Sequence, residues 1–199
     1  MLPSLGVLWS FGLVVALLTI TPGVDTALVL RSAAVAGRAR AWGAIVGFGC
    51  GVLAWGALTA VGVSALLAAS QIAYTVVRLA GAAYLVYLGG RLLWSAIRGH
   101  VGPATVSTGV TDTFGAGWRQ GLFTNLLNPK VGAFYLAILP QFIPTEAPHL
   151  TWGLALAGVH VLEGTLWLGL VLVLARSLRA WFERPRVIRW IDGVVGTVI

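Results

Sequence analysis

The first apolar run of the chain, 5–36, is long enough to cross a bilayer, yet the segment Thr21-Pro22-Gly23-Val24-Asp25 interrupts it. Proline cannot donate a hydrogen bond to the preceding helical turn, and its ring clashes with the carbonyl group four residues earlier. We therefore expect one helix that ends near Ile20 and another that begins near Pro22, with Thr21 as its N-cap. The free N–H groups at that second helix start would form a partly positive site that attracts an anion.

The composition indicates a chain that lies almost entirely in a membrane. Of its 199 residues, 58% are hydrophobic and 10% are charged, whereas a soluble domain has about 25% charged residues. This predicts an all-α integral membrane protein. In a soluble protein the net charge of +7 would suggest nucleic-acid binding. Here the basic residues fall between apolar spans and suit anionic lipid headgroups, so we expect no nucleic-acid partner.

Six transmembrane spans are predicted, at 5–36, 41–69, 72–97, 118–143, 150–175 and from about 187 onward. A polar cytoplasmic linker, 98–117, separates a first three-helix repeat, 1–97, from a second, 118–199. The last span reaches the end of the sequence after about 20 Å of helix, where about 30 Å of hydrocarbon must be crossed. Either the bilayer is thin there or this last helix is incomplete.

A ridge of small residues is predicted on the second span, where Gly43, Gly47 and Gly51 recur every four residues. Such a ridge lets another helix approach closely. We interpret these glycines as packing residues and not as ligand contacts.

The basic residues predict the orientation of the chain, because cytoplasmic loops of membrane proteins are enriched in Lys and Arg. The loops after the first, third and fifth spans carry Arg38, Arg40, Arg98, Arg119, Arg176, Arg179, Arg184, Arg186 and Arg189, and the other two loops carry none. Both termini are therefore predicted on the outer, periplasmic side. Seven of the nine tryptophans lie near predicted span ends, as in an interfacial aromatic belt.

The fourth span repeats the interruption of the first, because Asn128-Pro129-Lys130 offers an N-cap followed by a proline at the first helical position. Pro22 and Pro129 lie 107 residues apart, and the same shift moves the second span onto the fifth. Since three spans is an odd number, the two halves would form a 3+3 inverted repeat. Paired interrupted helices in such halves indicate a transport site, although two unrelated proline kinks would give the same pattern.

Three charged residues are predicted near the membrane midplane. Asp25, Lys130 and Glu163 each lie eleven to thirteen residues from an arginine at the cytoplasmic side, which corresponds to about 16 to 20 Å of helix. Charges at this depth are costly, and they usually pair or serve a transport pathway. His160 lies one turn from Glu163 on the same helix face. The structural alternatives are local helix capping by Asp25, charge neutralisation by Lys130 and a polar helix contact by His160 and Glu163.

Two other classes of function remain possible on the residues alone. A membrane enzyme would need a nucleophile with its base or a metal cluster, and the sequence has neither an HExxH nor a Gly-x-Ser-x-Gly motif. We therefore predict no enzyme, no cofactor and no metal site. A cation or metal-ion exporter, or a channel, could use Asp25, Glu163 and His160 as ligands, but Lys130 at the same depth would repel the ion.

The chain resembles the lysine exporter (LysE/RhtB) superfamily of bacterial amino-acid efflux proteins. The resemblance rests on motifs in the same order at 21–30, 37–38, 47–51, 79–85, 121–130 and 139–142. It implies a six-helix inner-membrane carrier that exports amino acids or similar small zwitterions by proton antiport. The sequence leaves open which amino acid is carried and whether the carrier forms a homo-oligomer.

The interrupted helices then give the candidate site. A substrate carboxylate could bind at the helix starts with Lys130, and a substrate ammonium could bind Asp25 or Glu163. The predicted substrate-binding residues are Thr21, Pro22, Gly23, Asp25, Asn125, Asn128, Pro129 and Lys130, and the predicted proton-coupling residues are Asp25, His160 and Glu163.

Overall fold

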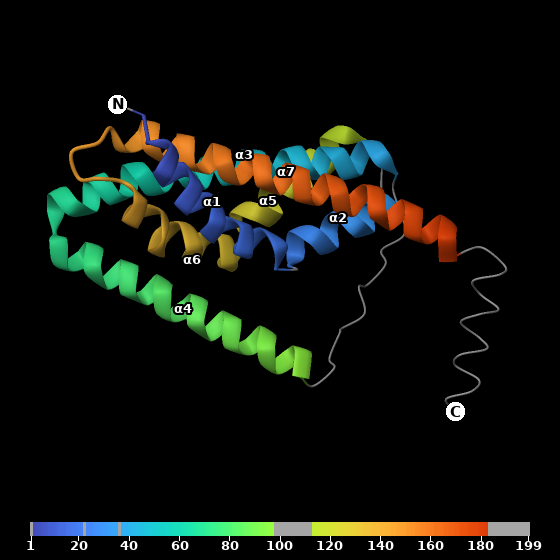
Figure 1. Cartoon of the computed structure of the whole chain (residues 1–199), viewed down its shortest axis with the longest axis horizontal. Coiled ribbons are helices and arrows are strands. Elements are labelled where there is room, and N and C mark those ends of the chain that lie inside the picture. The colour runs from blue at the N-terminus through green and yellow to red at the C-terminus, as the bar shows by residue number, and fades with distance from the viewer. Residues whose placement is uncertain (1, 22, 36, 98–112, 183–199) are drawn as a thin grey trace.

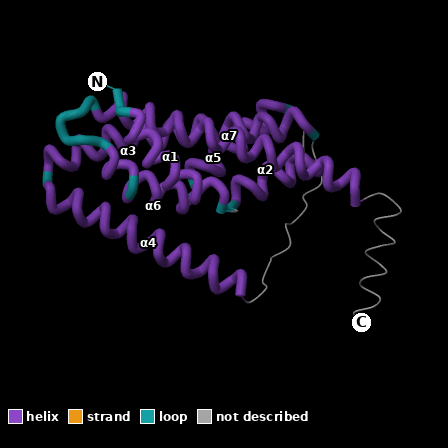
Figure 2. Tube along the Cα trace, viewed as in Figure 1, coloured by secondary structure: helices purple, strands orange, loops and turns teal. Residues whose placement is uncertain are grey.

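The structure, a computed structural model, describes residues 2–21, 23–35, 37–97 and 113–182, and these residues form helices and no strands (Figures 1 and 2). In chain order the elements are α1 (Leu5–Ile20), α2 (Val24–Val35), α3 (Arg38–Ala69), α4 (Gln71–Ile97), α5 (Phe114–Leu126), α6 (Pro129–Ala137), the short 3-10 helix η1 (Leu139–Phe142) and α7 (His149–Phe182). The predicted all-α class is confirmed for these ranges.

The long helices α3 and α7 pack against each other and carry the two broken helices. The α5 helix packs along α3, α1 packs against α7, and α2 packs against both α3 and α7. The α4 helix lies at the edge of the bundle, against α6 and α3 (Figure 1). Both broken helices therefore contact α3, and the first one also contacts α7.

Both predicted helix interruptions are present. The axis of α1 meets that of residues 24–30 at 59°, and α5 meets residues 129–142 at 53°. The second helix of the first pair begins at Val24, two residues later than predicted, and Pro22 lies outside the described residues. Gly37 then has a φ of 92° between α2 and α3, a left-handed conformation that glycine adopts without steric cost.

Within the described ranges, two helical segments are long and apolar enough to cross a membrane by themselves, Arg38–Gly62 and His149–Leu174. Each bent pair could form one more span, which gives up to four. The predicted third span corresponds to α4, and the predicted sixth lies at 187–199, outside the described residues. The six-span repeat therefore remains a prediction.

Large apolar side chains cover the outside of the bundle as well as its core. Phe11, Ile45 and Phe134 are buried at the centre, while Leu17 and Leu166 are among many exposed leucines on the outer helix faces. A lipid environment is needed to cover such a surface, because soluble proteins rarely expose apolar patches of this extent.

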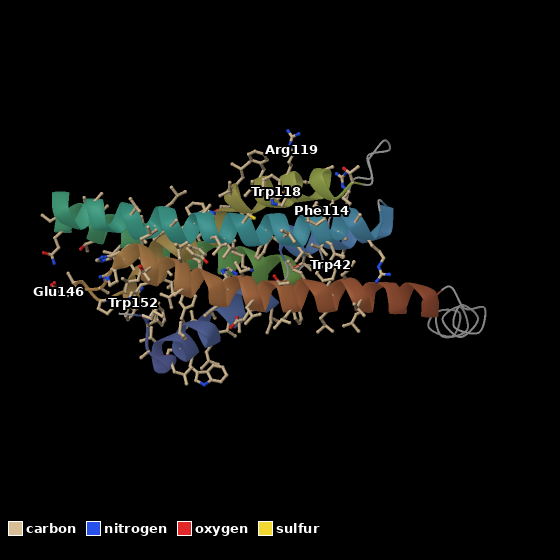
Figure 3. All side chains as sticks on the ribbon, turned by 90° about the horizontal axis from the view of Figure 1, so that it is seen from above. Trp42, Phe114, Trp118, Arg119, Glu146 and Trp152 are labelled. Carbon is tan, nitrogen blue, oxygen red and sulfur yellow. The ribbon has the colours of Figure 1, made fainter. Side chains whose placement is uncertain are left out.

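The tryptophans near predicted span ends differ in exposure, because Trp42 is partly exposed whereas Trp152 is buried in the core. Figure 3 shows Trp42, Trp118 and Arg119 in the same part of the bundle, and Trp152 near the end that carries Glu146. The aromatic belts at the two membrane surfaces therefore remain a prediction.

The small-residue ridge on α3 makes a close helix contact, as predicted, and the helix it contacts is α5. A methyl group on Gly43 would overlap the carbonyl oxygen of Phe114, and one on Gly47 would overlap that of Trp118. From the other side, a methyl group on Gly121 would overlap the carbonyl oxygen of Ala44. The two backbones are therefore close enough that only glycine fits.

We expect Gly47→Ala to lower the thermal stability of the detergent-purified protein, because the added methyl group would push α5 away from α3. Overpacking of this kind costs about 1–3 kcal/mol. Gly62→Ala is the matched control on the same helix, because a methyl group there meets no atom within 4 Å. Equal losses of stability in the two variants would contradict the close contact.

Candidate functional site

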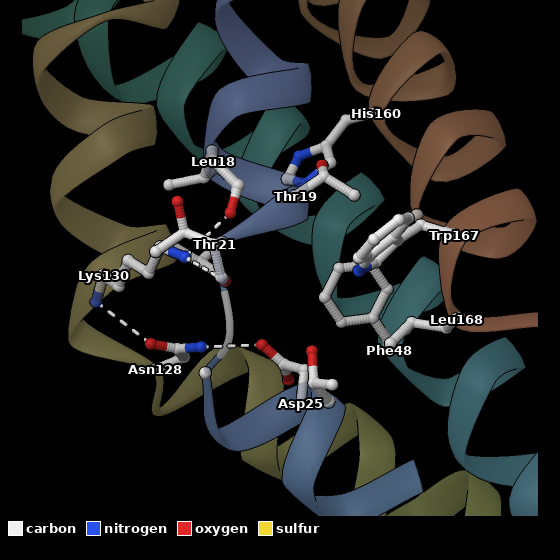
Figure 4. A pocket seen from close by; sticks show the side chains of 14 residues that line it. Leu18, Thr19, Thr21, Asp25, Phe48, Asn128, Lys130, His160, Trp167 and Leu168 are labelled. Atoms are coloured by element: carbon white, nitrogen blue, oxygen red, sulfur yellow. Dashed lines mark hydrogen bonds between the residues drawn. The ribbon is translucent and has the colours of Figure 1, made fainter. Parts of the chain in front are cut away.

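Asn128 makes two hydrogen bonds at the second helix break. Its Oδ1 accepts a hydrogen bond of 3.0 Å from the backbone N–H of Lys130, and Pro129 occupies the first turn of α6. Asn128 is therefore the N-cap of α6, as predicted. Its Nδ2 also donates a hydrogen bond of 2.7 Å to Oδ2 of Asp25. One amide side chain thus caps one broken helix and holds the carboxylate of the other (Figure 4).

Thr21 does not have the predicted role at the first break. Its Oγ1 donates a hydrogen bond of 2.6 Å to the carbonyl oxygen of Leu17, and its backbone N–H contacts the same oxygen at 3.3 Å. Thr21 therefore closes the end of α1 and is not the N-cap of α2. The hydroxyl group thus gives the Leu17 carbonyl a second hydrogen bond, in addition to the one from the backbone. Asp25 lies in the first turn of α2, where a negative charge is favourable.

The ammonium group of Lys130 reaches the end of α1. Its Nζ donates to the carbonyl oxygens of Leu18, at 2.7 Å, and Thr21, at 3.0 Å. These carbonyls form the negative end of the helix dipole. No direct ion pair joins Lys130 and Asp25 in the described part of the chain. The side chain that contacts Asp25 is Asn128.

A cavity lies between the two breaks. Among its lining residues are six of the predicted site residues: Thr21, Gly23, Asp25, Asn128, Lys130 and His160. The space open to the centre of a water-sized sphere is about 30 Å³, which is room for about two water molecules. A cavity of this size is smaller than an amino acid, so substrate binding would require it to widen.

His160 is almost completely buried, with 1% of its surface exposed. Its Nδ1 lies 3.1 Å from the hydroxyl group of Tyr135, and the two rings stack at 5.9 Å between centroids. Phe48 meets the imidazole edge-on at 5.8 Å. These contacts fix the imidazole between α6, α3 and α7 at the wall of the cavity.

Glu163 lies apart from the cavity, although it is one turn from His160. It belongs to a groove between α1 and α7, where a methyl group on Gly12 would come within 3.0 Å of its Oε1. Its Oε2 is buried and has no hydrogen-bond partner among the described residues. His160 and Glu163 were expected on the same helix face, but their side chains meet different neighbours. His160 contacts Tyr135, and Glu163 faces α1.

Two other predicted residues do not line the cavity. Asn125 of α5 is fully buried against Gly51 of α3. Its side-chain amide has no hydrogen-bond partner in the described ranges. Pro129 starts α6 but is not among the lining residues. The described residues also contain no group of three or more His, Cys, Asp or Glu that could hold a metal ion. The possible cation ligands Asp25, Glu163 and His160 are thus not gathered in one place.

Sequence reasoning missed Thr19 and Trp167, which both line the cavity. The positions of the tryptophans in the sequence could have indicated Trp167. Seven tryptophans lie near predicted span ends, and the remaining two, Trp55 and Trp167, lie inside spans. Trp55 donates to the backbone of Asn125 at 3.4 Å. Trp167 has no hydrogen-bond partner for its indole N–H among the described residues.

The fold and this site define a class: an α-helical integral membrane protein in which two broken helices bring a carboxylate and an ammonium group to one cavity. The chain belongs to the LysE type translocator family, whose model matches residues 16–199. This is a family of translocators and not a class of enzymes.

Two curated relatives carry the same description. The chain is similar to the homoserine/homoserine lactone efflux proteins of Salmonella typhi and Salmonella typhimurium strain LT2, at 29% and 28% identity over 88 residues. The matched segment is 44% of this chain and 43% of each relative. It therefore spans less than half of the relatives' length. No solved structure matches the chain significantly.

Proposed function

We propose that the chain is a secondary active carrier that exports amino acids or similar small zwitterions from the cytoplasm across the inner membrane by proton antiport. The observation that supports this best is the arrangement of Asp25 and Lys130. Both line one cavity, each at a helix break, and they do not pair with each other. Two opposite charges held apart in this way suit a ligand that carries both charges.

The free hydrogen-bonding groups suit the two ends of an amino acid. Oδ1 of Asp25 has no partner among the described residues and can accept from a substrate ammonium. Lys130 uses two of the three N–H groups of its ammonium on α1 carbonyls, so one remains for a substrate carboxylate. The N-terminal end of α6 adds positive potential on the same side.

Proton coupling follows if the substrate and the proton compete for the carboxylate of Asp25. A protonated Asp25 cannot hold an ammonium group, whereas an ionised Asp25 can. Inward-moving protons would then drive outward-moving substrate. His160, on the cavity wall, and Glu163, in the neighbouring groove, are the other groups that could carry the proton.

The bent pairs in corresponding places of the two halves support the inverted repeat. Under the 107-residue shift, Asp25 corresponds to Gly132 and Lys130 corresponds to Gly23. Each half thus supplies one charge at a position where the other half has glycine, and this asymmetry would orient a zwitterion. We propose that both termini face the periplasm, and labelling of terminal tags on intact cells tests this orientation.

Transport in inside-out vesicles tests the proposed function. Homoserine is the first substrate to use, because the two relatives are named for its efflux. We expect labelled homoserine to accumulate above its external concentration when the vesicle lumen is acidic, and to stop accumulating when an ionophore collapses the gradient. Vesicles without the protein are the control. Equilibration without accumulation would indicate a channel, and transport of a metal cation without any amino acid would indicate a cation exporter.

A further inference from the structure

Two spaces that each hold a carboxylate share one wall. The central cavity contains Asp25, and the groove between α1 and α7 contains Glu163. These are the two acidic residues of the described helices. Thr19 of α1 and Trp167 of α7 line both the cavity and the groove. The two carboxylates are therefore separated by a wall that contains a hydroxyl group and an indole N–H.

Each of these four residues has a buried polar atom without a hydrogen-bond partner within the described ranges. The atoms are Oδ1 of Asp25, Oγ1 of Thr19, Nε1 of Trp167 and Oε2 of Glu163. Buried polar groups in folded proteins are nearly always hydrogen-bonded, so a set of exceptions on the two sides of one wall requires an explanation. Ionisable residues inside a membrane protein commonly belong to proton relays. A proton that moves between the two carboxyl groups would use the atoms that are free here.

The hydroxyl group of Thr19 suits the transfer of a proton. A hydroxyl group can accept one hydrogen bond and donate another, whereas an indole N–H only donates. Thr19 can therefore receive a proton from one neighbour while it gives its own to another, and Trp167 can only orient an acceptor. Since both residues line the groove, they also offer donors to an ionised Glu163, and hydrogen bonds to an ionised group are the strong ones.

The charges around the cavity favour the wall at Trp167 for the entry of a proton. Figure 4 shows Lys130 on one side of the cavity and Trp167 on the other side. A proton that approached past Lys130 would meet a like charge, which costs energy in a poorly hydrated space. The groove is also the larger space, at about 290 Å³ against about 30 Å³ for the cavity. A proton can therefore reach the groove while the cavity is closed.

The other titratable groups near this wall are less suited to the role. Among the described residues, Glu163 is the only titratable residue that lines the groove, and α1 contributes none. His160 lines the cavity, but its Nδ1 already lies 3.1 Å from the hydroxyl group of Tyr135. Glu163 retains a free carboxyl oxygen and is therefore the better partner for Asp25.

We propose that Thr19 is a proton-transfer residue that links Glu163 to Asp25, with Trp167 as the donor that orients the link. The carboxyl group of Glu163 gives its proton to the oxygen of Thr19, directly or through water, while the hydroxyl proton of Thr19 passes to the carboxylate of Asp25. One proton has then moved from Glu163 to Asp25, and the hydroxyl group is restored. Glu163 stays ionised until it takes up the next proton. This inference rests on the proposed antiport and names the route by which the proton reaches the substrate site.

Two modes of transport separate proton transfer from substrate binding. Accumulation of labelled homoserine in proteoliposomes with an acidic lumen requires net proton transfer, whereas exchange of labelled for unlabelled homoserine requires none. Thr19→Val keeps the shape of the side chain and removes the hydroxyl group, and Glu163→Gln removes the titratable proton. We expect each variant to lose about tenfold or more of the initial rate of accumulation. Both should retain exchange, because Asp25 and Lys130 still bind the substrate.

Four further variants of the full chain serve as controls. Thr19→Ser keeps the hydroxyl group and should retain both modes. Thr59→Val removes another buried hydroxyl without a described partner, outside the cavity and the groove, and should also retain both. Trp167→Phe keeps an aromatic ring and removes only the N–H, so it should slow accumulation less than Thr19→Val does. Asp25→Asn should lose exchange as well as accumulation, because the contact with the substrate ammonium is lost.

Three results would overturn the route while the proposed function stands. Loss of both modes in Thr19→Val would indicate that the residue serves packing. Normal accumulation in either Thr19→Val or Glu163→Gln would show that protons do not pass through that residue. Selective loss of accumulation in His160→Gln, but not in Glu163→Gln, would assign the transfer to the imidazole. Wild-type protein that exchanges homoserine and never accumulates it would instead overturn the proposed antiport itself.

Discussion

Asp25→Asn is expected to abolish accumulation of amino acids driven by a proton gradient, while the protein still folds and inserts. The amide side chain has the same shape as the carboxyl group, and its oxygen can still accept the 2.7 Å hydrogen bond from Asn128. It can neither ionise nor take up a proton, so the competition between proton and substrate is lost. The accumulation ratio of the variant should therefore fall to the value that the wild-type protein reaches without a proton gradient.

Transport by purified Asp25→Asn in vesicles, with and without an acidic lumen, measures this effect. Glu146→Gln makes the same chemical change in the exposed turn before α7 and should leave transport unchanged. Glu163→Gln makes it in the α1 and α7 groove, outside the cavity. If Asp25→Asn exports at the normal rate and with normal pH dependence, coupling must be assigned to Glu163, to His160 or to no side chain.

Loss of the Lys130 charge should weaken binding of amino acids by about ten- to a hundredfold, or roughly 1.5 to 3 kcal/mol. The decarboxylated analogue of the same amino acid should lose much less. The reason is that Lys130 and the start of α6 supply the positive potential on one side of the cavity, and the carboxylate is the ligand group that needs it. Calorimetry on Lys130→Gln with the two ligands measures the difference.

The structure provides an alternative role for Lys130, because its Nζ closes the end of α1 through the carbonyls of Leu18 and Thr21. Gln can still donate to such a carbonyl, whereas Met cannot. If capping is the whole role, Lys130→Met should destabilise the protein more than Lys130→Gln does, and both ligands should lose affinity equally. If Lys130 mainly neutralises Asp25, the double variant with Asp25→Asn should recover stability without any preference for ligands that carry a carboxylate.

The sequence determined the parts of this protein that depend on short-range rules. Proline and glycine fix where the two apolar runs break, because a missing N–H and a ring clash act within one helical turn. Asn128 before Pro129 predicts the cap of α6 for the same reason. The four-residue glycine spacing predicts a close helix contact on α3, which the structure places against α5.

The tertiary structure decided which way each side chain faces. Residues His160 and Glu163 are three apart, which separates them by about 60° around the helix axis. The rotation of α7 against its neighbours therefore turns one toward Tyr135 and the other toward α1. Sequence spacing alone cannot supply that rotation, because it is set by packing against residues far away in the chain.

Packing between distant segments also determines which residues line the cavity. Depth along the helix, which the sequence gives at 1.5 Å per residue, places Asp25 and Lys130 at one level. The link between them through Asn128 joins residues 103 positions apart, and the approach of Thr19 and Trp167 joins α1 to α7. Such contacts form only when the broken helices pack together, so they belong to the tertiary structure and not to any local pattern.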